Sequence, residues 1–200
     1  MKGGRHRAIS TALVVAVVST FVTAMAGTAS ALWCYGTVPP VNWTGTAGAD
    51  VKTGGAAENN WDLLGGNDDV DTLGGSDHVC AGSGADQVLL GDEDDGAYGN
   101  DGDDTIQGQG NNDNINGWAG DDDLYGGGAS DWIFGDEAND EIWGGDGSDH
   151  YNVDAGGLYG YIANDTIRGE GGDDYIDGGG GTGDTCIGGD GMDQIVNCEA

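Results

Sequence analysis

The sequence predicts an all-β fold, a parallel β-roll, that is, a right-handed β-solenoid built from stacked 18-residue coils. Three observations predict it: a nine-residue repeat runs through most of the chain, one mostly apolar residue recurs in each repeat, and 43 of the 200 residues are glycine. A unit this short cannot bury its own apolar residue, so neighbouring units have to stack. Two units, each with one short strand, make one coil.

The repeat is marked by an acid at a fixed place, which we number position six of the unit. Nine-residue steps lead without a break from Asp50 to Asp149, with the neutral Asn59 as the second member. Seven extra residues within 153–163 and one within 178–183 then shift the register. The acids of the series are Asp50, Asp68, Asp77, Asp86, Asp95, Asp104, Asp113, Asp122, Asp131, Asp140, Asp149, Asp165, Asp174, Asp184 and Asp193.

The apolar residue lies two places after the acid, at position eight. Three residues suffice for a very short strand, in which position eight faces one way and its neighbours face the other. The six remaining residues must turn the chain, and glycine supplies the backbone conformations that side chains disfavour. Stacked coils, about 4.8 Å apart, would then gather the position-eight residues into one thin core.

Stacking also superimposes the turns, and this arrangement suits calcium. Ca²⁺ takes six to eight oxygen ligands in a flexible cage, which backbone carbonyls and aspartates of two stacked turns can supply. Magnesium is stricter, and zinc prefers nitrogen or sulfur. His78 and His150 fall on outward strand positions and are interpreted as surface residues. We therefore predict several calcium ions bound by the fifteen aspartates, beside the turn glycines Gly48, Gly66, Gly84, Gly102, Gly120, Gly147, Gly172 and Gly191.

Ligands would pair across 18 residues, which gives the solenoid two edges. Position four is mostly glycine on the edge of Asp50 and Asp68, and mostly another residue on the edge of Asn59 and Asp77. A β-carbon there would strain a turn that needs positive φ. We expect tighter calcium binding on the first edge, a weaker site at Asn59, and an interruption of the calcium sites at 153–163.

The clearest units are Gly99–Gln107 and Gly188–Val196, which match G-G-x-G-x-D-x-U-x with U a large apolar residue. The chain thus resembles the haemolysin-type (repeat-in-toxin, RTX) calcium-binding family over about residues 45–196. The resemblance implies calcium binding at the matching positions. Toxin and protease activity are not implied, because the large effector domains of those relatives have no counterpart among the repeats and caps.

The first 31 residues are predicted to be a secretory signal peptide. Lys2, Arg5 and Arg7 precede an apolar run over 8–26 and the sequence Ala29-Ser30-Ala31. A membrane anchor is the alternative, but no basic cluster follows the run. Cleavage would leave two bases against 36 acids. Nucleic acid and anionic lipid would repel such a surface, so we expect a secreted, extracellular monomer without membrane insertion.

Four cysteines, in an oxidising compartment, allow three disulfide connectivities. We favour Cys34–Cys80 and Cys186–Cys198, one pair at each end of the solenoid, over a metal cluster of four scattered cysteines. Residues 32–44 and 197–200 are predicted to be caps that cover the open ends. The regular repeats are expected at 45–152, an irregular insertion at 153–163 and the C-terminal repeats at 164–196.

Three classes of function remain. The first is an extracellular calcium-binding module with a structural or surface-interaction role, unfolded without calcium. The second is an enzyme, or an accessory part of one, but no Ser/His/acid or Cys/His set lies off the repeat, and we predict no catalytic residue. The third is recognition of a carbohydrate or cell-surface partner through outward aromatics: Tyr98, Trp132 and Phe134 on one strand stack, with Tyr125 and Trp143 on the other.

Overall fold

A computed structural model describes residues 41–152, 164–179 and 183–198, all within one compact unit. These residues form seventeen strands. They are β1 Trp43–Thr44, β2 Val51–Gly55, β3 Asn60–Asp62, β4 Asp69–Leu73, β5 His78–Ser83, β6 Gln87–Gly91, β7 Gly96–Asp101, β8 Thr105–Gln109, β9 Asn114–Ala119, β10 Asp123–Gly128, β11 Trp132–Glu137, β12 Glu141–Asp146, β13 His150–Asn152, β14 Thr166–Gly171, β15 Tyr175–Asp177, β16 Thr185–Asp190 and β17 Gln194–Val196.

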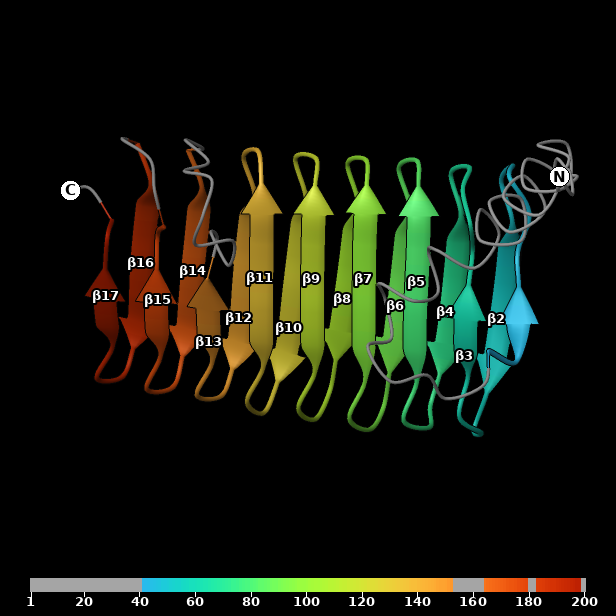
Figure 1. The fold of residues 1–200 in the computed structure, drawn as a ribbon. Coiled ribbons are helices and arrows are strands. Elements are labelled where there is room, and N and C mark those ends of the chain that lie inside the picture. Colours follow the sequence, from blue (N-terminus) through green and yellow to red (C-terminus); the bar gives the residue numbers. More distant parts are fainter. Residues whose placement is uncertain (1–40, 153–163, 180–182, 199–200) are drawn as a thin grey trace, which may run out of the picture. The chain divides into compact units, whose positions relative to one another are not determined.

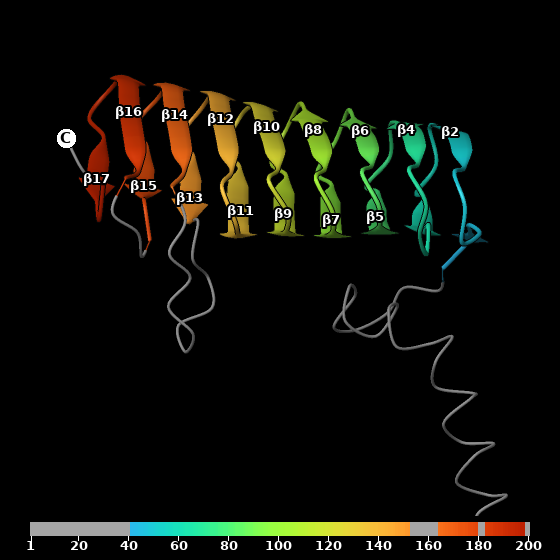
Figure 2. The same cartoon turned by 90° about the horizontal axis from the view of Figure 1, so that it is seen from above.

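The strands lie in two parallel sheets, as Figure 1 shows. Odd-numbered strands make a nine-stranded sheet and even-numbered strands an eight-stranded one. Each strand pairs with the strand one coil away, for example Leu124 with Ile106 and with Ile142. Seen from above, the two sheets face each other along the solenoid (Figure 2). The described residues thus form an all-strand β-solenoid of about eight turns, which confirms the predicted β-roll.

The strands are longer than the three residues that the repeat demands. Many, such as β8 and β9, continue for five or six residues into positions one and two of the next unit. Position two then has positive φ, even where it is not glycine, as at Asn100 (78°), Gln109 (78°) and Trp118 (80°). The chain therefore reverses through two left-handed residues per turn, at positions two and four, and the sequence had indicated only the second.

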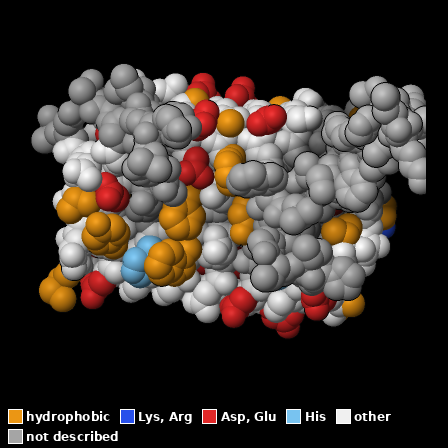
Figure 3. Space-filling model, in the orientation of Figure 1, with side chains coloured by type: hydrophobic (Ala, Val, Ile, Leu, Met, Phe, Trp, Pro, Cys, Tyr) orange, Lys and Arg blue, Asp and Glu red, His pale blue; other side chains and the backbone are white. Residues whose placement is uncertain are grey.

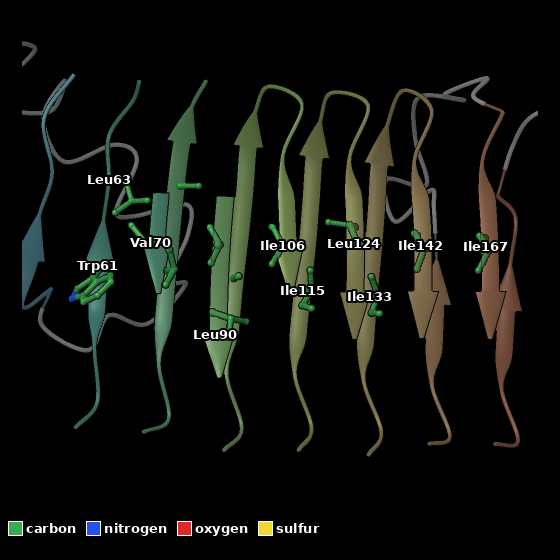
Figure 4. Close-up of a cluster of buried hydrophobic side chains, with 14 of the residues drawn as sticks. Trp61, Leu63, Val70, Leu90, Ile106, Ile115, Leu124, Ile133, Ile142 and Ile167 are labelled. Carbon is green, nitrogen blue, oxygen red and sulfur yellow. The ribbon is translucent and has the colours of Figure 1, made fainter. Parts of the chain in front are cut away.

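The core lies between the sheets, and the position-eight side chains make up most of it (Figure 4). Ile106, Ile115, Leu124, Ile133 and Ile142 are fully buried, each supplied by one strand. The N-terminal coils add a second inward rank at position one, formed by Leu63, Thr72, Ala81 and Leu90, also fully buried. The nine-residue repeat predicted one thin core of position-eight residues throughout, and this second rank was not expected from it.

The seven extra residues do not break the stack. On either side of 153–163, which lie outside the described residues, β12 pairs with β14 and β13 with β15. Ile142 is thereby opposite Ile167, and Tyr151 is opposite Ile176. The repeat therefore resumes in register one coil later.

At the first described coil the repeat starts earlier than predicted. Trp43, assigned to the cap, pairs with Trp61 and occupies the position-eight site of its own coil. Its ring packs edge-on against Trp61 at 5.8 Å, and Lys52 Nζ lies 5.5 Å and 5.7 Å from the centres of the two rings. These three side chains occupy the end of the core in place of another coil.

The C-terminal end is tied by a disulfide between Cys186 and Cys198, which confirms that predicted pair. Both cysteines pack against the core, so the bond holds the last segment on the stack. Cys80 is also disulfide-bonded. The predicted partner, Cys34, lies outside the described residues, as do the predicted signal peptide and most of the N-terminal cap. No helix among the described residues is long and apolar enough to cross a membrane.

Candidate metal sites in the stacked turns

The position-six aspartates form two ladders, one along each edge of the solenoid. In each ladder the carboxylate Oδ1 accepts a hydrogen bond from the backbone N–H of the position-six residue one coil before. On the first edge the N–H of Asp104 donates to Asp122 Oδ1 at 2.8 Å, and that of Asp122 donates to Asp140 at 3.0 Å. On the second edge the N–H of Asp113 donates to Asp131 at 2.9 Å. The position-six aspartate side chains therefore point into the interior of the solenoid and contact the turn of the preceding coil.

All fifteen predicted aspartates belong to these ladders. On the first edge the series is Asp50, Asp68, Asp86, Asp104, Asp122, Asp140, Asp165 and Asp184. On the second, Asn59 is followed by Asp77, Asp95, Asp113, Asp131, Asp149, Asp174 and Asp193. Asp50 and Asp193, near the ends, are half-buried, and the other thirteen aspartates are buried.

Both ladders cross the insertion without a gap. The N–H of Asp140 donates to Asp165 at 2.9 Å, and that of Asp149 donates to Asp174 at 3.0 Å. The expected interruption at 153–163 is therefore wrong for the aspartate ladders, because the described turns before and after these residues stack directly on one another.

Each ladder aspartate forms one rung of its ladder. In most rungs the second carboxylate oxygen, Oδ2, is buried and has no hydrogen-bond partner among the described residues. This holds for Asp68, Asp77, Asp86, Asp95, Asp104, Asp113, Asp122, Asp131, Asp140, Asp174 and Asp184. A buried carboxylate oxygen without a donor is costly, more so when it is ionised. Such a regular series of bare acceptors points to a cation as the missing partner.

Burial raises the pKa of these carboxyl groups, and the repulsion between successive rungs adds to the effect. The pKa rises to about 6 for Asp86, about 8 for Asp104 and Asp113, about 7 for Asp122 and about 9 for Asp140, in each case chiefly through desolvation. Without a counter-ion the ladder would hold protons near neutral pH. A divalent cation bound beside these carboxyl groups would favour their ionised form and so lower their pKa again.

Glycines at position one allow the bare oxygen to lie where a β-carbon would otherwise be. A β-carbon at Gly117 would overlap Asp122 Oδ2 and lie 3.0 Å from the carbonyl oxygen of Gly135, one coil further. At Gly99 it would overlap Asp104 Oδ2 and lie 2.7 Å from the carbonyl oxygen of Gly117. We call this place, where a ladder Oδ2 and a carbonyl oxygen of the next coil approach a position-one glycine, the position-one cradle. Open cradles with both oxygens lie at Gly45, Gly99, Gly108, Gly117, Gly126 and Gly169, and at Gly135 and Gly188 the nearest atoms belong to the ladder aspartate alone.

Position four also follows the sequence prediction of positive φ from Gly66 onward. Among the predicted turn glycines, φ lies between 121° and 154° at Gly66, Gly84, Gly102, Gly120, Gly147, Gly172 and Gly191. Gly48 in the first turn does not share this conformation. Glu93, Asn111, Ala129 and Ala138 adopt it in spite of their β-carbons, with φ between 71° and 87°.

A further ladder, at position five, was missed in the sequence. There the side-chain oxygen accepts from the backbone N–H one coil later, in the opposite sense to position six. Asp103 Oδ1 accepts from Asp121 at 3.1 Å, and Asp121 Oδ1 accepts from Asn139 at 3.0 Å. The recurrence of Asp, Asn or Ser immediately before the ladder acid was the available signal. These exposed bonds pin adjacent turns together from outside.

Side chains alone do not form a metal centre here. Within the described residues no group of three or more His, Cys, Asp or Glu side chains is arranged to hold an ion. Each gap between coils offers ladder carboxylates from two turns, so the remaining ligands would have to be backbone carbonyls. Calcium accepts that mixture, whereas zinc and magnesium do not favour it. The residues present therefore fit calcium.

Two parallel sheets of short, glycine-turned strands with buried aspartate ladders define a class of protein, the acidic β-roll whose stacked turns bind cations. The family model for the RTX calcium-binding nonapeptide repeat matches in four copies, over residues 63–97, 98–133, 125–157 and 158–183. The chain belongs to this RTX calcium-binding nonapeptide repeat family. A search of curated proteins found no match.

Proposed function

We propose that the protein is an extracellular calcium-binding module with a structural or surface-interaction role. The observation that carries this proposal is the double ladder of buried carboxylates with bare Oδ2 atoms. The fifteen ladder aspartates are the proposed ligands, together with backbone carbonyls of the turns. Only two bases, Lys52 and Arg168, follow the predicted signal peptide. Both lie over tryptophan rings, so soluble cations are the available counter-charge.

Calcium is proposed to control folding as well. An ion that binds only the stacked coils stabilises them by mass action. Without bound cations, the thin core must stabilise the stacked coils against the mutual repulsion of the ladder carboxylates. Calorimetry with calcium on the chain from residue 32, with circular dichroism in parallel, tests both points. We expect uptake of several ions and a gain of β structure. An unchanged β spectrum in chelator would refute control of folding, and no uptake at millimolar calcium would refute the function.

The two edges are proposed to differ in affinity. On the first edge, glycine at Gly102 and Gly120 adopts the left-handed position-four conformation freely. On the second edge, Asn111 and Ala129 must adopt a positive φ with a β-carbon, at a cost of about 1 kcal/mol or more each. A calcium titration followed by crystallography should fill the first edge at lower concentration. Equal occupancy at every concentration would reject the difference.

Recognition of a carbohydrate or cell-surface partner is the second candidate. Figure 3 shows hydrophobic side chains gathered beside a histidine on one face. Among the described aromatic residues, Trp132, which is 53% exposed, stacks on His150 at 4.8 Å and 5°, and His150 stacks on Tyr175 at 6.4 Å and 30°. Rings paired face to face turn their edges outward, whereas a sugar stacks on an open ring face. The geometry therefore favours a stabilising stack. Glycan-array binding that is lost on Trp132→Ala would reverse this preference.

An enzymatic role has less support. Paired acids such as Asp121 and Asp122 are the obvious catalytic candidates, but both belong to ladders and accept backbone N–H groups of neighbouring coils. Their environment repeats along the whole stack, whereas a catalytic pair needs one singular environment.

A further inference from the structure

The position-one cradle differs along the solenoid. From Gly99 onward the described position-one residues are glycines, and at most of them the ladder Oδ2 lies where a β-carbon would be, an arrangement shared by Gly45 in the turn of Asp50. In four consecutive earlier turns, those of Asp68, Asp77, Asp86 and Asp95, the residues five places before the aspartate have side chains. They are Leu63, Thr72, Ala81 and Leu90, and all are fully buried.

These side chains close the cradle. A β-carbon at an equivalent glycine would overlap the ladder Oδ2, so the space that a glycine leaves is here occupied by side-chain atoms. Thr72 goes further, because its hydroxyl donates to the carbonyl oxygen of Leu90, one coil later. The matching position-one carbonyl in an open turn, such as that of Gly117, borders the free cradle instead. In the turn with Thr72, therefore, neither the space nor this carbonyl oxygen is available to an ion.

The same side chains enlarge the core. Between Trp61 and Ala97 the coils bury two inward ranks, Leu63, Ala81 and Leu90 beside Val70, Val79 and Val88. Figure 4 shows Leu63 and Leu90 in the same cluster as the position-eight residues. Burying a Leu side chain stabilises the folded state by an amount comparable with what one bound ion would add. Apolar contact can therefore replace metal in this block.

We propose that the turns of Asp68, Asp77, Asp86 and Asp95 bind no calcium, and that coils 61–97 form a calcium-independent block on which calcium-dependent coils from Gly99 onward assemble. This inference rests on the proposed function and narrows it: Asp68, Asp77, Asp86 and Asp95 are withdrawn from the fifteen proposed ligands, although their Oδ2 atoms are also bare, and calcium is assigned to the open turns. It predicts that folding starts from the N-terminal coils and proceeds towards Cys198 as calcium rises.

Hydrogen exchange followed by mass spectrometry on the chain from residue 32 tests the division. In chelator, peptides from 61–97 should exchange at least tenfold more slowly than peptides from 105–146. In calcium both should be protected. Equal loss of protection in the two regions would overturn the inference while leaving calcium binding intact. If neither region responds to calcium and none is bound, the proposed function itself fails.

A matched pair of variants tests the cradle directly. Gly117 and Ala81 occupy the same position on the same edge, two coils apart, and neither has positive φ. Gly117→Ala adds a methyl group to an open cradle and should remove at least one bound calcium ion per chain. Ala81→Gly should remove none. Gly128→Ala, where a β-carbon meets only ordinary contact at 3.9 Å, controls for the loss of a glycine. Loss of an ion on Ala81→Gly, or none on Gly117→Ala, would overturn the assignment.

Discussion

Replacing Asp122 by Asn should have opposite effects with and without calcium. Asp122 is buried in the middle of the first-edge ladder, and its Oδ2 has no partner among the described residues. Asn59 shows how an amide fits this position, because its Nδ2 donates to the carbonyl oxygen of Ala57 in the same turn at 2.6 Å. An amide at 122 could donate in the same way to Gly120. In the absence of calcium, the free energy of unfolding should therefore rise by about 1–3 kcal/mol in Asp122→Asn, because this is the usual cost of an unsatisfied buried group.

In the presence of calcium, Asp122→Asn should instead lower the free energy of unfolding. Asp122 lies between the coils of Asp104 and Asp140, so its loss should remove one or two ions. For sites with a Kd of about 10⁻⁴–10⁻³ M in about 10 mM calcium, each lost ion lowers the free energy of unfolding by about 1.4–2.7 kcal/mol.

Two titrations measure the reversal. In chelator, the midpoint of folding induced by trimethylamine oxide should move to lower osmolyte concentration for Asp122→Asn. In calcium, the urea midpoint should fall. Asp121→Asn is the matched control, since it removes one charge from the adjacent exposed position, where Asn67, Asn112 and Asn139 occur naturally. Unchanged calcium uptake by Asp122→Asn, or destabilisation in chelator, would show that the ladder carboxylates are not placed for metal.

Three further outcomes are expected. Ile133→Ala should lower the free energy of unfolding in calcium by about 2–5 kcal/mol, whereas the exposed neighbour Trp132→Ala should cost much less; equal effects in urea unfolding would contradict a single central core. In chelator, acid should favour folding: the folded-state pKa of several ladder carboxyls lies at about 6 to about 9, above the ordinary value of 3.8. This stabilisation is therefore complete below about pH 4 and lost as the pH rises through that range. Circular dichroism against pH checks it, and β content that rises with pH would contradict it. Cys186→Ser with Cys198→Ser should speed hydrogen exchange in β16 and β17 but not in β8; equal acceleration in all three would argue against a terminal clamp.

Much of the fold could be predicted because the repeat imposes one conformation many times over. The spacing of Asp104, Asp113 and Asp122 fixes both the coil length and the edge on which each acid lies. The position-eight residues, such as Ile115, identify the inward face, because side chains alternate along a strand. The C-terminal disulfide followed from the need to close an open end, although the sequence left three connectivities.

Other features could not be predicted because they depend on the neighbouring coil. Whether the ladder continues across residues 153–163 depends on how the strands before and after them pair, which no local pattern shows. The positive φ at Trp118 is imposed by the close approach of superimposed turns, and Trp itself does not prefer it. The ring stacking of Trp132 on His150 likewise requires strands that are 18 residues apart in sequence to lie side by side.

The repeat, the sheet type, the acids that face the turns and the family to which they point can all be read from the amino-acid sequence. Which oxygen of each aspartate is bonded and which is bare, and the burial of Leu63 and Leu90 in the core, follow instead from how the coils stack. The physical reason is that a single nine-residue unit is too short to bury any side chain. Buried side chains, position-one cradles and aspartate ladders form only where one coil contacts the next, so the sequence of one unit cannot specify them.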